Sequence, residues 1–137
     1  MLHTATLFHD DLVDGAPLRR GRQTLHTVWP VGAAVLAGDY LLGQATKLVA
    51  ELGHPHILGT FGEILCTICA GEIRQVLSSG ETERTREAYY RHIEAKTASL
   101  FAALADMAAT LAEAPPSHIV RWAGFGRELG LAFADRR

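Results

Sequence analysis

The apolar residues of this chain recur at helical spacing, and no stretch alternates apolar and polar residues for long. The clearest segment is His56–Leu77, which lies between Gly53-His54-Pro55 and Ser78-Ser79-Gly80, both typical of helix ends. A single stripe at the 3.6-residue period is formed there by Ile57, Leu58, Phe61, Ile64, Leu65 and Ile68. The sequence therefore predicts an all-α fold, with His56–Leu77 as its clearest helix.

Four further helices are expected from the same periodicity and from helix start and stop signals. Gly15–Arg22 is expected to be a loop, and Thr24–Pro30 is ambiguous. Thr82 or Thr85 can cap the fourth helix, and the last helix can be capped by Ser117 after the break at Pro115-Pro116. The four segments are Met1–Asp14, Gly32–Leu52, a long helix ending near Ala112, and Ser117–Ala134. We see no domain boundary and expect residues 1–137 to form a single helical domain.

Length and composition narrow the class of protein. The chain has 137 residues, 48% hydrophobic and 20% charged, which is ordinary globular composition and enough for a core. The net charge of −2 gives no reason to expect nucleic acid, and no unbroken apolar run reaches the ~18 residues of a membrane span. Cys66 and Cys69 make no disulfide framework, so a cytoplasmic location is expected, with both cysteines as small core residues.

The stretch Thr6–Arg22 combines acids with arginines. If it begins as a helix, Asp10 and Asp14 are i,i+4 neighbours on one face, with Asp11 about 100° round the helix. Carboxylate oxygens are ligands of hard divalent cations, and the arginine fork matches phosphate oxygens. A solvated acidic face is the alternative interpretation. Because Arg19 and Arg20 follow the acids so closely, we favour a metal and diphosphate site.

A second group of polar residues lies on two later helices. A lysine in a helix is most often solvated, but Lys96-Thr97 is flanked by Ile93, Leu100 and Phe101, which suggests that this side is partly buried. If Lys96 points into a cleft, it can bind a diphosphate. Glu72 and Gln75 are at i,i+3 and share a helix face, either at the surface or beside a cleft.

A different enzyme class is also compatible with part of the pattern. His9-Asp10 is a dyad of the kind found in HD-type metal phosphohydrolases, which need another His upstream. His3 lies only six residues before His9 on the same helix and fits that role poorly. This interpretation also leaves Asp14 and the arginines without a role.

Five segments resemble, in order, those of the trans-isoprenyl diphosphate synthases, or polyprenyl synthetases. LFHDDLVD followed by LRRGR resembles the family's first aspartate-rich motif, DDxxD, and VLAGDYLLGQA is similar to the helix that follows it. GEIRQ resembles the GExxQ segment, YRHIEAKTASLF the Lys-Thr segment, and LGLAF the entry to the second aspartate-rich motif. The resemblance covers nearly the whole chain.

The resemblance implies an isoprenoid synthase-type helical bundle, usually homodimeric, that condenses an allylic diphosphate with isopentenyl diphosphate. It implies that Asp10, Asp11 and Asp14 bind Mg²⁺ and that Arg20 contacts isopentenyl diphosphate. The allylic diphosphate would be contacted by Arg19, Lys96 and Thr97, with Glu72 and Gln75 bordering the site.

The resemblance also bears on product length. In this family bulky residues four or five positions before the first Asp shorten the product, and those positions are Thr6 and Ala5 here. Both are small, so we expect a medium- or long-chain polyprenyl synthase whose product is shortened by Ala5→Phe.

The chain resembles the middle of such a synthase, truncated at both ends. The family has a basic Gly-Lys-Arg segment before DDxxD, and its second aspartate-rich motif follows LGLAF, where this sequence has Ala134-Asp135-Arg136-Arg137. A prenyltransferase and a non-catalytic prenyl-diphosphate-binding subunit of the same fold are therefore both open. The apolar faces left bare predict a homodimer or higher oligomer.

Overall fold

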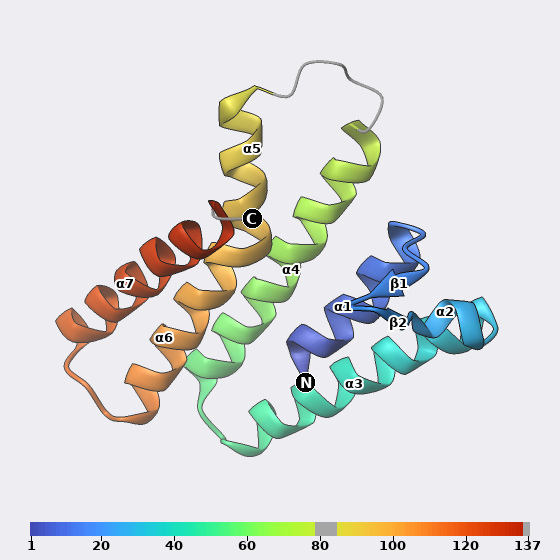
Figure 1. The fold of residues 1–137 in the computed structure, drawn as a ribbon. Helices are drawn as coiled ribbons and strands as arrows, with labels where there is room; N and C mark the ends of the chain where they lie inside the picture. The colour runs from blue at the N-terminus through green and yellow to red at the C-terminus, as the bar shows by residue number, and fades with distance from the viewer. Residues whose placement is uncertain (79–84, 136–137) are drawn as a thin grey trace. The chain divides into compact units, whose positions relative to one another are not determined.

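The computed structural model describes residues 1–78 and 85–135 and divides the chain into two compact units, Met1–His54 and Pro55–Arg137. Helices dominate both units (Figure 1), which confirms the all-α prediction. A single domain over residues 1–137 stays a prediction.

The first unit is built on two helices, α1 (Leu2–Val13) and α3 (Val31–Glu51), which pack against each other. Its buried non-polar positions are small: Ala5 of α1 is 2% exposed and Ala34 of α3 is 1% exposed, and Gly38 of α3 is also buried. Small side chains allow two helix backbones to approach closely, so this pairing depends on close contact rather than on large apolar side chains.

The connection between α1 and α3 is more ordered than the sequence suggested. The predicted loop contains a hairpin of β1 (Leu18–Arg19) and β2 (Arg22–Gln23), with Leu18 opposite Gln23. Its two turn residues both have left-handed backbones, φ 51° at Arg20 and φ 75° at Gly21, which is typical of tight hairpin turns. The loop prediction was therefore wrong at Leu18, Arg19 and Arg22, and the ambiguous segment Thr24–Pro30 contains the short helix α2 (Leu25–Val28).

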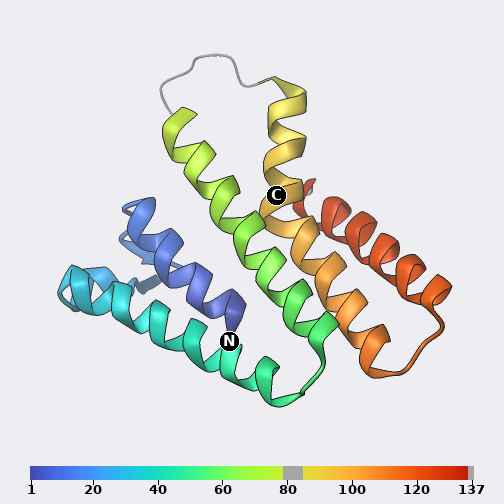
Figure 2. The same cartoon turned by 180° about the vertical axis from the view of Figure 1, so that it is seen from behind.

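The second unit holds α4 (Pro55–Ser78), α5 (Arg86–Ile93), the π-helix η1 (Glu94–Ala98), α6 (Ser99–Leu111) and α7 (Pro116–Asp135). Figures 1 and 2 both show α5 leading into α6 without an intervening loop but with a bend, and α6 lies between α4 and α7. The predicted fourth helix is therefore confirmed, with an inserted π-turn that the apolar pattern did not indicate.

Two helix starts test the capping predictions. The Thr85 side chain accepts a hydrogen bond from the backbone N–H of Ala88 at 3.2 Å, so Thr85 caps α5, while Thr82 lies outside the described residues. The prediction that Ser117 caps the last helix was wrong, because α7 begins at Pro116 and the Pro115 carbonyl accepts from His118 N–H. Proline suits the first helical position because it lacks the N–H that would be unpaired there.

The core of the second unit follows the predicted α4 stripe. Ile57, Phe61, Ile64 and Ile68 are 1–7% exposed, whereas Leu58 is 43% exposed. From the other helices, Ala98, Ala103 and Ala109 are buried, so the core combines large side chains on α4 with small ones opposite.

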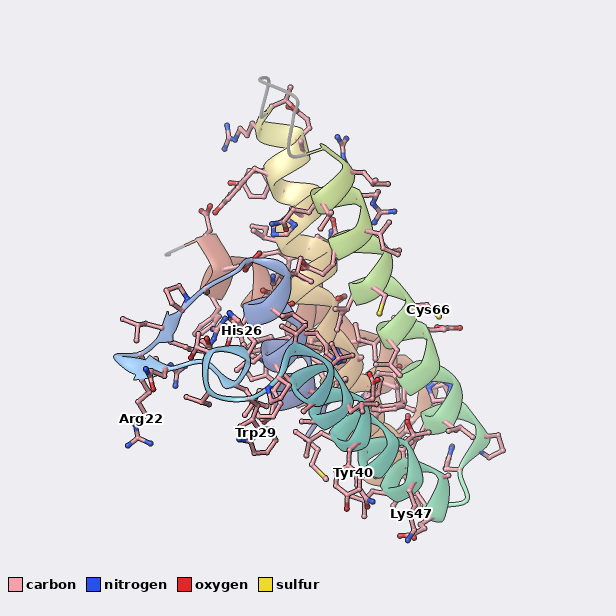
Figure 3. The ribbon with its side chains drawn as sticks, turned by 90° about the vertical axis from the view of Figure 1, so that its right-hand side faces the viewer. Arg22, His26, Trp29, Tyr40, Lys47 and Cys66 are labelled. Atoms are coloured by element: carbon pink, nitrogen blue, oxygen red, sulfur yellow. The ribbon has the colours of Figure 1, made fainter. Side chains whose placement is uncertain are left out.

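Two expectations about α4 need revision or remain open. Cys66 and Cys69 are both free and exposed, so their assignment to the core was wrong. Figure 3 shows Cys66 on α4. One helix of the described chain, Pro55–Leu77, is apolar and long enough to span a membrane on length and composition, with mean hydropathy 1.2. Core helices of globular proteins pass the same test, so this is weak evidence, and the absence of a membrane span stays a prediction.

Candidate metal and diphosphate site

The acidic cluster lies at the C-terminal end of α1. Asp10 and Asp11 are 9% and 5% exposed, and Asp14, at the C-cap, is exposed and donates its N–H to the Asp10 carbonyl at 2.8 Å. This helical hydrogen bond places Asp10 and Asp14 one turn apart, as the spacing predicted. Two shielded carboxylates beside an accessible one form an anionic helix end.

The hairpin carries Arg19 back to this helix end. Nε of Arg19 donates to Oδ1 of Asp11 at 2.6 Å, and the Asp11 side chain is only 7% exposed. Ala16 supports the approach, since its N–H donates to the Asp11 carbonyl and its own carbonyl accepts from Thr24 Oγ1 at 2.6 Å. The structure thus brings together Asp11 and Arg19, and pairs the arginine with the carboxylate.

Thr24 is a supporting residue that the sequence analysis missed. It is 2% exposed, and besides its hydroxyl bond its N–H donates to the Pro17 carbonyl at 3.1 Å. These two bonds close the segment that contains the hairpin. The only signal in the sequence was a small polar residue between a glycine-containing turn and an apolar segment, which is common in loops.

Arg20 stays apart from the contacts made by Arg19. It is an exposed turn residue with a left-handed backbone, and Figure 3 shows its neighbour Arg22 extending outward from the hairpin. Arg20 is therefore accessible to an anion, and its role stays a prediction.

The three carboxylates are chemically suitable ligands for a hard cation, but they do not form a complete coordination site by themselves. All three side chains offer oxygen ligands, which suit Mg²⁺. Within residues 1–78 and 85–135, however, no three His, Cys, Asp or Glu side chains are gathered closely enough to hold a metal ion. Mg²⁺ is usually bound by one or two carboxylates together with water and substrate phosphates, so this donor set fits a metal that arrives with a diphosphate.

In the second unit, the π-helix positions Lys96. Nζ of Lys96 lies 2.9 Å from Oε1 of Glu72 on α4, with the side chains 31% and 18% exposed. A π-turn adds one residue to a helical turn, and such insertions are frequent at functional sites. The structure therefore joins two of the predicted site residues, and places Thr97 in the same π-turn and Gln75 three residues after Glu72 on α4.

The π-helix is held on its other side by α7. Arg127 donates two hydrogen bonds to Oε1 of Glu94, at 2.8 and 2.6 Å, and this carboxylate raises the pKa of the Arg127 guanidinium above its usual value. A Cβ added to Gly130 would lie 2.6 Å from Cα of Ala98. Close backbone contact and an ion pair thus fix both ends of the π-turn.

Comparison with known proteins identifies relatives along nearly the whole chain. A model of the polyprenyl synthetase family matches residues 1–134. Heptaprenyl diphosphate synthase component 2 of Geobacillus stearothermophilus is 36% identical over 133 residues, which are 97% of this chain and 42% of that protein. Octaprenyl diphosphate synthase of Escherichia coli is 37% identical over 132 residues, 96% of this chain and 41% of that protein.

Solved structures that resemble this chain come from the same class of enzymes as its sequence relatives. A decaprenyl diphosphate synthase from Rhodobacter capsulatus is similar at TM-score 0.92 and 34% identity, over 97% of this chain and 41% of that one. A polyprenyl synthase from Caulobacter crescentus, crystallised with calcium and isoprenyl diphosphate, is similar at TM-score 0.93 and 37% identity, over 97% of this chain and 40% of that one. The chain thus spans about two fifths of the length of the relatives it matches.

Proposed function

The chain belongs to the polyprenyl synthetase family, and on that premise we propose that it contributes to a Mg²⁺-dependent trans-prenyltransferase. The reaction condenses an allylic diphosphate with isopentenyl diphosphate to give a polyprenyl diphosphate. The observation that carries the proposal is the acidic end of α1 with Arg19 folded against it. We do not retain the HD-type phosphohydrolase interpretation, because the family match includes the His9-Asp10 dyad.

In this proposal Asp10, Asp11 and Asp14 hold Mg²⁺ against the allylic diphosphate. The metal, when bound, supplies positive charge that makes diphosphate a better leaving group. Arg19 neutralises Asp11 in the structure, so it has to exchange that partner, or share it, to reach a diphosphate oxygen. A guanidinium has five donors, which allows sharing between a carboxylate and a phosphate.

Lys96 and Thr97 are proposed to contact an allylic diphosphate, with Glu72 and Gln75 beside them. The Glu72 carboxylate is close enough to hold the Lys96 ammonium in place. A fixed cation stabilises charge as it develops on a leaving group without reorganising during the reaction. Arg20 is proposed to bind isopentenyl diphosphate.

A second candidate is a prenyl-diphosphate-binding subunit that does not itself catalyse turnover. It is favoured by one observation: Asp11 is already paired with Arg19. Among the described residues, no three potential metal ligands are gathered closely enough to hold a metal ion. Such a subunit binds the allylic diphosphate but needs a complete synthase for product formation.

We also propose a homodimer or higher oligomer in the cytoplasm. The support for an oligomer is the exposure of large apolar side chains on both units, among them Leu36 at 67%, Leu77 at 80% and Val120 at 72%. Apolar surface of this extent favours association. A monodisperse monomer in sedimentation velocity experiments would contradict this proposal.

The experiment that tests the function is Mg²⁺-dependent incorporation of labelled isopentenyl diphosphate onto farnesyl diphosphate. It is run with the chain alone and with a complete synthase added, and Asp10→Ala/Asp14→Ala is the control. Product from the chain alone, lost in the control, supports the transferase. Altered rate only with the added synthase supports the binding subunit, and no effect in either case contradicts both.

A further inference from the structure

His9, the residue before the acidic pair, makes a contact that the proposed function does not use. Its Nε2 lies 3.2 Å from the Val35 carbonyl oxygen and 3.3 Å from Oδ1 of Asp39. Both neighbours are acceptors, so Nε2 carries the hydrogen and donates to α3. The imidazole is thereby tied to one turn of α3, between Val35 and Asp39.

Gly38 makes room for this contact. A Cβ at position 38 would lie 2.3 Å from Nε2 of His9 and 2.7 and 2.9 Å from two ring carbons. Real Cβ atoms do not approach other heavy atoms this closely, so any other residue at position 38 displaces the imidazole. Because Gly38 lies inside a regular helix, the requirement is for space and not for an unusual backbone conformation.

The contact determines which way the rest of α1 faces. His9 lies about 100° round the helix from Asp10 and about 140° from Asp14, at 100° per residue. Fixing His9 on α3 therefore fixes the rotation of α1 about its own axis and the direction in which both carboxylates project. Ala5, one turn before His9, is buried but has no polar group to specify that rotation.

We propose that His9, seated over Gly38, hydrogen-bonded to the Val35 carbonyl and in contact with the Asp39 carboxylate, is a positioning residue that sets the orientation of the metal-binding carboxylates on α1. The inference rests on the proposed function, since it assigns a role relative to the Mg²⁺ and diphosphate site. Residues that orient ligands without touching the metal typically change metal affinity about 10- to 100-fold when replaced.

The test compares two alanine substitutions on the same helix. Gly38→Ala places a methyl group on the imidazole, whereas Gly43→Ala is the matched control, because its Cβ would meet no described atom within 4 Å apart from the backbone of its own helix. Binding of Mn²⁺ with inorganic pyrophosphate to the full 137-residue chain is measured by electron paramagnetic resonance. Circular dichroism and the thermal midpoint of each variant report folding separately.

A second comparison separates positioning from general packing. His9→Ala removes the ring that Gly38→Ala would displace, so the two changes act on one contact and should not add. We expect Gly38→Ala and His9→Ala each to weaken binding roughly tenfold or more, the double variant to resemble His9→Ala alone, and Gly43→Ala to bind like the wild type.

The outcomes distinguish the inference from the proposal on which it rests. Wild-type affinity in folded Gly38→Ala or His9→Ala would overturn the positioning role and leave the metal site standing. Additive losses in the double variant would also overturn it, because they would mean two unrelated defects. No Mn²⁺ binding by the wild-type chain would overturn the metal site and the positioning role together.

Discussion

The ammonium of Lys96 lies 2.9 Å from a carboxylate oxygen of Glu72, so an ion pair links the π-helix η1 to α4. The two residues belong to different motifs and are 24 positions apart in the sequence. Oε1 of Glu72 is shielded from solvent, so the ion pair is partly protected from screening by water. The lysine side chain is therefore held against α4 by this ion pair.

The first prediction separates Lys96 from its partner. We expect Lys96→Met to weaken binding of an allylic diphosphate roughly tenfold or more, because a charged hydrogen bond contributes about 1.5–3 kcal/mol. Glu72→Gln keeps the side-chain size at position 72 and leaves Lys96 in place, so we expect it to reduce the affinity for the diphosphate less. Lys47→Met, at an exposed lysine of α3 visible in Figure 3, is the control and should change nothing. Equal affinities for Lys96→Met and Lys47→Met would contradict the assigned role.

The second prediction concerns Arg19 and its buried partner. Arg19→Met leaves the Asp11 carboxylate, 7% exposed, without its cation, so we expect unfolding free energy to fall by about 1–3 kcal/mol. Arg22→Met, on the paired strand, removes an exposed side chain and should cost less than about 0.5 kcal/mol. Urea denaturation measures both, and equal small losses would mean that the pair contributes little.

The third prediction tests the close approach of α7 to the π-helix. Gly130→Ala would place a methyl group 2.6 Å from the Ala98 backbone, which cannot move as a side chain can. Overpacking of this kind costs about 1–3 kcal/mol. Gly124→Ala, on the same helix and facing open space, should be neutral or stabilising, because alanine favours helix by about 1 kcal/mol. Similar thermal midpoints for the two variants would show that α7 does not pack as described.

The fourth prediction refines the argument about product length. Ala5 is 2% exposed, so Ala5→Phe has to enlarge a filled interior and is expected to cost about 1–3 kcal/mol in stability. Thr6 is only half-buried, with its hydroxyl bonded to the His3 carbonyl, and Thr6→Phe is the cleaner test. This prediction is checked by measuring the chain length of the prenyl products, made either by the chain alone or by the chain with a complete synthase. Unchanged product length in a folded Thr6→Phe variant would contradict the assignment of these positions.

Much of the helical architecture could be predicted because it depends on local rules. The α4 stripe followed from apolar spacing, and most helix ends followed from Gly and Pro. The exposure of Cys66 could not be inferred, because small residues in an apolar helix fit a core and a surface equally well. The π-turn was also missed, since an insertion of one residue barely disturbs a helical pattern.

In the candidate site, too, the features that depend on local helix geometry were predictable, and those that depend on contacts between distant residues were not. The one-turn separation of Asp10 and Asp14 follows from helix geometry and was predictable. The pairing of Asp11 with Arg19 was not, because it depends on a hairpin whose turn places the non-glycine Arg20 at φ 51°. The hydrogen bond of His9 to the Val35 carbonyl was likewise not predictable, since it depends on the space over Gly38 in another helix.

The most direct test of the account is calorimetric titration of the chain with farnesyl diphosphate, with Mg²⁺ and with EDTA in its place. The account predicts saturable binding in Mg²⁺ that is lost in EDTA and in Asp10→Asn/Asp14→Asn, a variant that keeps the side-chain size. Equal affinity with and without the metal, or full affinity in the double variant, would contradict a metal and diphosphate site at the end of α1.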